Sequence, residues 1–175
     1  WSLNEYLERD HPVQKMILDR MADLLRMPSA EFIGVHDDCG APTYLLQLCQ
    51  IAFLYAQLAS GNNLDMERIV RAMTNHPSLI SGKGGFDTEL MCLAEGEILS
   101  KAGSEGIQCV ARVGQGLGLA IKVLDGSKRA KYAVAIHLLK QLGWITPTLS
   151  EKLEEQFMLI GDYKRLDIVG ELTMI

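Results

Sequence analysis

Apolar residues in the first half of the chain recur at the spacing of amphipathic helices. Between Val13 and Leu25 they fall three or four positions apart, which places them on one face of a helix that Pro28 would end. Ser2 and Glu5 have the spacing of a capping box, so we also expect a helix to start at the N-terminus. The same reasoning predicts helices over residues 12–27, 45–59, 63–75 and 88–95.

The second half of the chain shows the residue pattern that is typical of strands. Two such segments, 106–113 and 117–124, are separated by Gly114-Gln115-Gly116, which predicts an antiparallel hairpin. Helical patterns follow the hairpin, and the chain closes with another strand-like run. The sequence therefore predicts an α+β protein that consists of a helical region, the hairpin, helices over 128–142 and 151–157, and a final strand over 166–173.

Shorter segments link these elements. Residues 31–35 suit a short strand, and the polar stretch from His36 to Pro42 suits a tight turn. Pro42 itself suits the first turn of the helix that follows. Residues 76–86 are rich in glycine and contain a proline, which predicts a loop.

Composition limits the class of protein and its partners. The 175 residues, 48% of them apolar, suffice for one domain or at most two small ones. A net charge of −5 argues against a nucleic acid or an anionic membrane as partner, because both bind basic surfaces. The sequence shows neither a signal-peptide pattern nor an apolar run of the roughly 18 residues that span a bilayer. The four cysteines form no C-x-x-C pair, so we expect reduced thiols and a cytoplasmic location.

One polar cluster combines side chains that bind metals or transfer protons. It is the run His36-Asp37-Asp38-Cys39. Consecutive residues rarely all face one ion, so the alternative is an Asx-type turn followed by a small buried cysteine. The spacing leaves both interpretations open.

A lysine within a strand is the second candidate. Alternation places Lys122 on the same face as Ala120 and Leu124, among apolar neighbours. One interpretation is a solvated or edge-guarding lysine. The other is a desolvated lysine that can be neutral and act as a base.

The first hairpin strand and the segment before it add further candidates. Glu105 lies in a glycine-rich turn and is either a site residue or a solvated acid. Cys109 in the strand suits a small core residue better than a ligand. Cys49 and Cys92 lie on apolar helical segments, so we expect both to be buried.

Taken together and in order, these segments resemble one family. They are HPVQ (11–14), DDCGAPT (37–43), HP (76–77), GKGGFDTELM (82–91), KAGSEG (101–106), GLAIKVLDG (118–126) and LDIVG (166–170). The set resembles the L-asparaginase II family of the rhizobial type over nearly the whole chain.

That resemblance implies a serine-dependent amidohydrolase with a fold similar to that of serine β-lactamases and glutaminases. It would hydrolyse L-asparagine to L-aspartate and ammonia through an acyl-enzyme. By the same resemblance, Lys122 assists the nucleophilic serine. Asp37, Cys109 and Glu105 are assigned to substrate binding, and Cys39 is assigned as a zinc ligand.

Two segments that the family carries, S-x-x-K with its nucleophile and C-S-G-K-H, do not occur in this sequence. We therefore expect residues 1–175 to form either a single domain or the C-terminal half of a larger asparaginase-like domain. The chain alone would be inactive, would need its N-terminal half as a partner, and would form a homo-oligomer or aggregate through the apolar surface left open.

Two positions differ from the family pattern. Asp38 stands where the family usually has glycine, and Gly85 stands where it usually has arginine. Together with the absent nucleophile motif, these differences support an alternative function. The chain would then be a non-catalytic relative or fragment that binds a small amide, a metal or a partner chain.

Overall fold

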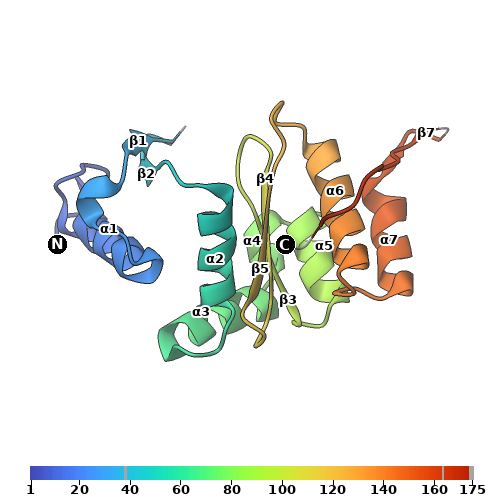
Figure 1. Cartoon of the computed structure of the whole chain (residues 1–175), viewed down its shortest axis with the longest axis horizontal. Coiled ribbons are helices and arrows are strands. Elements are labelled where there is room, and N and C mark those ends of the chain that lie inside the picture. Colours follow the sequence, from blue (N-terminus) through green and yellow to red (C-terminus); the bar gives the residue numbers. More distant parts are fainter. Residues whose placement is uncertain (38, 163, 174–175) are drawn as a thin grey trace.

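The computed structural model describes residues 1–37, 39–162 and 164–173 (Figure 1). Within them it has the α+β architecture that the sequence predicts, with seven α-helices and three small antiparallel sheets. The helices are α1 (Pro12–Leu25), α2 (Leu48–Leu58), α3 (Leu64–Asn75), α4 (Ser78–Ser81), α5 (Phe86–Leu93), α6 (Lys128–Gln141) and α7 (Pro147–Phe157). The strands are β1 (Gly34–His36), β2 (Pro42–Tyr44), β3 (Ile98–Ala102), β4 (Ile107–Arg112), β5 (Leu117–Lys122), β6 (Leu159–Ile160) and β7 (Lys164–Arg165).

A three-stranded antiparallel sheet in the order β3-β4-β5 forms the centre of the molecule. Figure 1 shows this sheet nearly edge-on, with α2 on one face and α5 and α6 on the other. Helix α7 packs against the outside of α6, and the β1–β2 hairpin lies with α1 on the far side of α2. The turn that carries Glu105 therefore lies at the end of β5 that carries Lys122.

Two groups of buried side chains hold these layers together. The larger group joins the sheet to α5, α6 and α7, and in it the rings of Phe86 and Tyr132 stack 4.6 Å apart. The smaller group lies on the opposite face and includes Leu99 and Ala111. Because strand residues alternate between faces, Val110 belongs to the first group and Ala111 to the second.

Close packing of α2 on the sheet depends on one glycine. A Cβ atom at Gly118 on β5 would lie 2.1 Å from the carbonyl oxygen of Ala52 and 2.7 Å from the amide nitrogen of Ala56. Only a residue without a side chain lets the helix backbone approach the strand this closely. The approach brings α2 directly over the strand that carries Lys122.

Polar side chains start several of these helices, as their sequences predict. Asn63 accepts hydrogen bonds from the amides of Asp65 and Met66 at the start of α3. Ser127 caps α6 in the same way, and His11 caps α1 through its Nδ1 atom. These local signals are why the predicted positions of α1, α3 and α6 agree with the structure.

The structure corrects the prediction for both chain ends. Residues around Ser2 and Glu5 form turns, not a helix, with the amide of Asn4 donating to Ser2 Oγ. Residues 166–173 are described without a strand. Their backbone bonds instead to α6, where the Gln141 amide group pairs with both the N–H and the carbonyl of Leu172.

Three predictions between the ends are also corrected. Pro42 begins β2 and pairs with His36 on β1, so it does not open a helix. The predicted loop 76–86 contains the single turn of α4. Strand β3 was not predicted at all, although it forms one edge of the central sheet. Among the described residues, none of the helices is both long and apolar enough to cross a bilayer.

Candidate functional site

The end of β5 and the β3–β4 turn bring Lys122 and Glu105 together. Lys122 is exposed at the last position of this edge strand, and its Nζ donates to the main-chain carbonyl of Glu105 at 2.5 Å. The structure therefore agrees with the solvated interpretation of Lys122, and the desolvated one is wrong. Leu124, predicted to share its face, lies beyond the strand and is 94% exposed.

The turn that carries Glu105 has an unusual backbone. Glu105 has a φ of 54° and Gly106 a φ of 78°, both in the left-handed region. A Cβ at Gly106 would lie 2.6 Å from the carbonyl oxygen of Val123. The carbonyl of Gly106 in turn accepts the amide of Val123 at 3.0 Å. The turn is thus bonded to the chain just after β5, and Glu105 stays exposed at its tip.

Cys109 lies on the same sheet face as Lys122, but in the interior. It pairs with Ala120 of β5 and is 3% exposed, as the core interpretation predicts. Burial raises the pKa of its thiol to about 11, while a hydrogen bond with Tyr55 of α2 opposes that shift. Burial also raises the pKa of the Tyr55 phenol. Both groups are therefore protonated at neutral pH.

The second group of candidates lies in the β1–β2 hairpin. Asp37 Oδ1 accepts the amides of Cys39 and Ala41, each at 2.9 Å, which is the geometry of an Asx-type turn. Asp37 and Cys39 are both exposed, so the turn interpretation holds while the expected burial of the cysteine does not. The hairpin forms its own sheet, and among the described residues no hydrogen bond joins it to Lys122 or Glu105.

A buried polar network lies on the opposite face of the sheet, and sequence reasoning missed it. Asp87 of α5 is 1% exposed, and its Oδ1 accepts Ser100 Oγ at 2.6 Å and Gln108 Nε2 at 2.8 Å. Its Oδ2 accepts the amide of Ala102 at 2.9 Å. Gln108 Oε1 is buried without a partner among the described residues. The sequence signals were the position of Asp87 within the resembling segment 82–91 and its place before the predicted helix 88–95, which it was expected to cap. The structure instead begins α5 at Phe86 with Gly85 as the cap, so Asp87 lies within the first turn.

A buried lysine belongs to the same region. Lys131 of α6 is 2% exposed, and its Nζ donates to the carbonyls of Gly103 and Ile107, at 3.2 and 3.1 Å. Burial lowers the pKa of this lysine, and the nearby charge of Asp87 acts in the opposite direction. The desolvated lysine that the sequence suggested at position 122 is therefore found at position 131.

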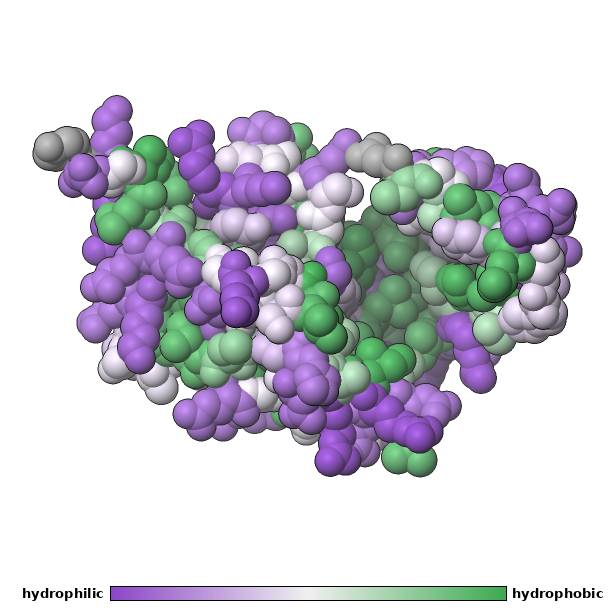
Figure 2. All heavy atoms as spheres, turned by 180° about the vertical axis from the view of Figure 1, so that it is seen from behind, coloured by the Kyte–Doolittle hydropathy of each residue, from purple (hydrophilic) through white to green (hydrophobic). Residues whose placement is uncertain are grey.

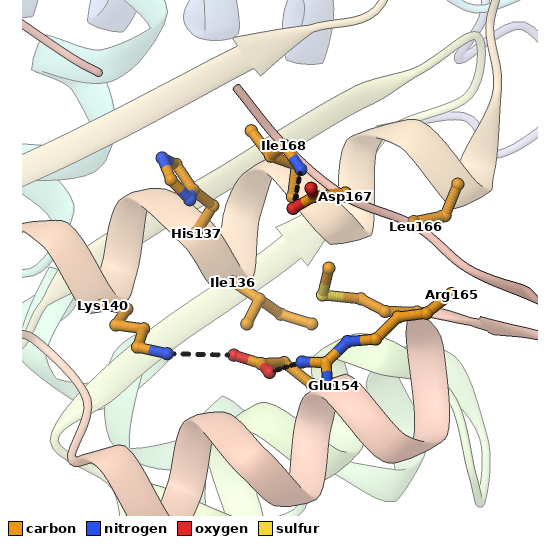
Figure 3. A pocket seen from close by; sticks show the side chains of 9 residues that line it. Ile136, His137, Lys140, Glu154, Arg165, Leu166, Asp167 and Ile168 are labelled. Carbon is orange, nitrogen blue, oxygen red and sulfur yellow. Dashed lines mark hydrogen bonds and ion pairs between the residues drawn. The ribbon is translucent and has the colours of Figure 1, made fainter. Parts of the chain in front are cut away.

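A hollow of about 420 Å³ lies between α6, α7 and the C-terminal segment (Figure 3). Glu154 lies in it with its side chain only 12% exposed, between Lys140 and Arg165, which lies very close to it. Ser150 Oγ also donates to Glu154, at 2.7 Å. These charges satisfy one another, which is typical of a structural ion-pair network.

The comparison with protein families decides the identity of the chain. The family model described as L-asparaginase II matches residues 1–174. The chain belongs to the L-asparaginase II family. This confirms the resemblance found in the sequence and implies an asparaginase-type enzyme that acts on asparagine. A search of curated proteins gave no match.

The zinc site that the family resemblance implies needs several side chains around one ion. Zinc in proteins takes three or four protein ligands. The described residues contain no group of three or more His, Cys, Asp or Glu side chains that could hold a metal. Cys39 offers one exposed thiol, and Asp37 Oδ1 is already engaged by backbone amides. The described residues therefore do not form a complete zinc site by themselves.

One of the two departures from the asparaginase pattern has a structural reason. Gly85 precedes α5, and a Cβ there would lie 2.4 Å from the carbonyl oxygen of Ser81. An arginine at this position would require a different path of the backbone between α4 and α5. The other departure, Asp38, lies outside the described residues.

Proposed function

We propose that this chain supplies part of the active site of an asparaginase that hydrolyses L-asparagine to L-aspartate and ammonia. The family match over residues 1–174 carries the proposal. The exposed position of Lys122 supports it, because a residue that serves the reaction must be reachable by substrate. The hydrogen bond to Glu105 supports it too, since it fixes the Lys122 ammonium group at a defined place.

In the proposed reaction a serine hydroxyl attacks the side-chain amide carbon of asparagine. A lysine of the S-x-x-K motif accepts the hydroxyl proton and delivers it to the departing nitrogen, so that ammonia leaves and an acyl-enzyme remains. The exposed ammonium group of Lys122 assists the serine by stabilising the negative charge that develops during the attack. Water then attacks the ester, which releases aspartate and regenerates the serine. Backbone N–H groups stabilise the negative oxygen that forms in each step.

The other assigned residues take binding roles in this proposal. Asp37, Glu105 and Cys109 contribute to substrate binding, with Cys109 acting as a neutral thiol in the wall behind Lys122. Cys39 acts as one ligand of a zinc ion that needs further ligands from elsewhere. No step of the reaction passes through that ion.

The nucleophile is proposed to lie on an N-terminal half, because the present sequence contains no S-x-x-K motif. Residues 1–175 would then be the C-terminal half of a larger, β-lactamase-like domain. Apolar side chains remain exposed on α1 and α2, among them Ile17 at 42% and Phe53 at 44%. Figure 2 shows an apolar hollow on this side of the molecule, which supports association of the isolated chain with itself.

The decisive experiment measures ammonia release from L-asparagine by the protein extended upstream to include S-x-x-K, and by residues 1–175 alone. We expect turnover only from the extended protein. In it, Lys122→Met should lower kcat by roughly 100-fold or more, the usual cost of removing a group that stabilises charge in the transition state. Lys152→Met, which removes an exposed lysine on α7, is the matched control and should leave kcat unchanged.

Two outcomes would count against the proposal. One is an extended protein that folds but releases no ammonia, and the other is a Lys122→Met variant with full activity. Calorimetry with L-asparagine then tests the alternative function, in which the chain binds a small amide without hydrolysing it. Binding without turnover indicates a non-catalytic relative that holds a small amide.

Light scattering of residues 1–175 tests self-association, and a monomer at high concentration contradicts it.

A further inference from the structure

Lys131 lies beneath the turn that carries Glu105, on the sheet face opposite Lys122. Its Nζ donates to the carbonyl of Gly103 at 3.2 Å and to the carbonyl of Ile107 at 3.1 Å. These two residues are the ends of the turn, and the amide of Gly103 donates to the same Ile107 carbonyl at 3.0 Å. One ammonium group therefore bridges both ends of the turn.

The same turn is held at its tip from the other side. Lys122 Nζ donates to the carbonyl of Glu105, and the amide of Val123 donates to the carbonyl of Gly106. The left-handed backbone at Glu105 is unfavourable for a residue with a side chain, so such contacts must maintain it, whereas Gly106 adopts the same region freely. Lys122 and Lys131, which lie on opposite faces of the sheet, therefore both donate hydrogen bonds to carbonyls of this one short turn.

We propose that Lys131 is a positioning residue, which fixes the turn 103–107 from below and thereby sets the place of Glu105 and Lys122 in the site. Its consequence for catalysis rests on the proposed asparaginase function. The effect of Lys131 on the turn is independent of that function, because its hydrogen bonds to the turn are made within this chain.

The cost of burying a lysine supports a specific role. A buried ammonium group loses hydration, and an apolar residue of similar volume often serves stability as well or better. Lys131 has compensating partners in the two carbonyls and in the ring of Tyr132, whose centroid is 5.2 Å away. The charged and titratable groups around it are Asp87 of α5, Lys101 of β3, Cys109 of β4 and Lys128 on its own helix.

The test compares Lys131→Met with the unchanged protein and with Lys128→Met, an exposed lysine one turn earlier on α6. We expect Lys131→Met to retain most of its global stability, because methionine fills the space without a charge. Hydrogen exchange at the amides of Gly103, Ile107 and Val123 should nevertheless become about tenfold faster, the equivalent of one charge-assisted hydrogen bond. Lys128→Met should exchange like the unchanged protein.

Reductive methylation provides a second measurement that needs no variant. In the unchanged protein Lys131 should be modified far more slowly than Lys128. Equal rates at the two lysines, or unchanged exchange at the three amides in Lys131→Met, would overturn the proposal.

An activity measurement links the turn to the proposed reaction. In the upstream-extended protein, Lys131→Met should lower kcat more than it changes KM, because substrate still binds while Lys122 is misplaced. Accelerated exchange with an unchanged kcat would overturn the positioning role in catalysis. Accelerated exchange in a protein that shows no turnover under any condition counts against the asparaginase function, and leaves the role of Lys131 in the turn intact.

Discussion

Ser100 Oγ donates to Asp87 Oδ1 at 2.6 Å, a hydrogen bond that joins the middle of β3 to the first turn of α5. Both residues are buried, at 0% and 1% exposure. Gln108 of β4 and the amide of Ala102 complete the ring of donors around the carboxylate. Asp87 therefore connects the helix to two neighbouring strands, directly beneath the edge of the sheet that leads into the Glu105 turn.

Replacing Asp87 with alanine should destabilise the protein strongly. Ser100 Oγ and the amide of Ala102 would lose their acceptor in a dry environment, at a cost of about 1–3 kcal/mol for each buried group left unpaired. Gln108 Nε2 would keep only its bond to Ser100 Oγ at 3.0 Å among side chains. We expect a total loss of roughly 3 kcal/mol or more in the free energy of unfolding, measured with urea. Asp19→Ala on the exposed face of α1 is the matched control and should change stability by less than about 0.5 kcal/mol. Similar unfolding curves for the two variants would refute the role of the network.

The hairpin and most helices could be predicted because their signals are local. The turn glycines separate β4 from β5, and capping residues such as Asn63 mark where helices start. Strand β3 has no such signal. Its first three residues, Ile98 to Ser100, are all buried, so polar and apolar positions do not alternate. Only the neighbouring elements make that segment a strand.

In the final segment, 166–173, the sequence predicts a strand that the structure does not contain. Leu166 and Ile168 pack against the core, as a strand-like pattern requires. Their backbone, however, finds no neighbouring strand among the described residues, and Leu172 bonds to the side chain of Gln141 instead. A residue pattern predicts which side chains are buried, but it does not supply a partner for the backbone.

The candidate site, too, could be predicted only where the sequence carried a local signal. Lys122 stood out because a charge interrupts an apolar strand. Lys131 did not, since lysine in a helix beside Lys128 and Arg129 resembles a solvated face. Its burial depends on how α6 packs on the sheet. For Cys49 and Cys92 the predicted burial is wrong. Both lie on apolar segments, but their positions on the helices leave them exposed.

Thiol chemistry tests the positions of all four cysteines. Cys39, Cys49 and Cys92 are exposed, whereas Cys109 is buried and burial raises its pKa to about 11. Because the thiolate is the reactive form, an aromatic disulfide reagent at pH 8 should modify three thiols rapidly and the fourth slowly. The Cys109→Ser variant should lose only the slow phase. Four equal rates in folded protein would contradict the burial of Cys109.

The contact of α2 with β5 predicts a strong effect of a single methyl group. In Gly118→Ala the new Cβ meets backbone atoms of Ala52 and Ala56, which cannot move without displacing the helix. Overpacking of this kind should cost about 1–3 kcal/mol of unfolding free energy. Gly34→Ala is the control, because its Cβ would meet only the end of the Arg9 side chain, 3.1 Å away, which can turn aside. Equal stability of the two variants would exclude the close approach.

The Glu154 network predicts how stability depends on acid pH. Burial alone would raise the pKa of this carboxyl group, but the hydrogen bond from Ser150 and the charges of Lys140 and Arg165 outweigh it and lower the pKa below its usual value of 4.5 (Figure 3). A carboxyl group with a lower pKa in the folded state binds protons more readily when unfolded. Its stabilising contribution is therefore complete above pH 4.5 and is lost as the pH falls through the folded-state pKa.

Glu154→Gln removes this titration while preserving the shape of the side chain. We expect the variant to be less stable than the unchanged protein at pH 7 and the difference to shrink as the pH falls below 4.5, measured by urea unfolding at each pH. Glu151→Gln, an exposed position on the same helix, should follow the curve of the unchanged protein. A constant difference between Glu154→Gln and the unchanged protein at every pH would mean that the network acts by packing alone, because an ion pair must weaken when its carboxylate is protonated.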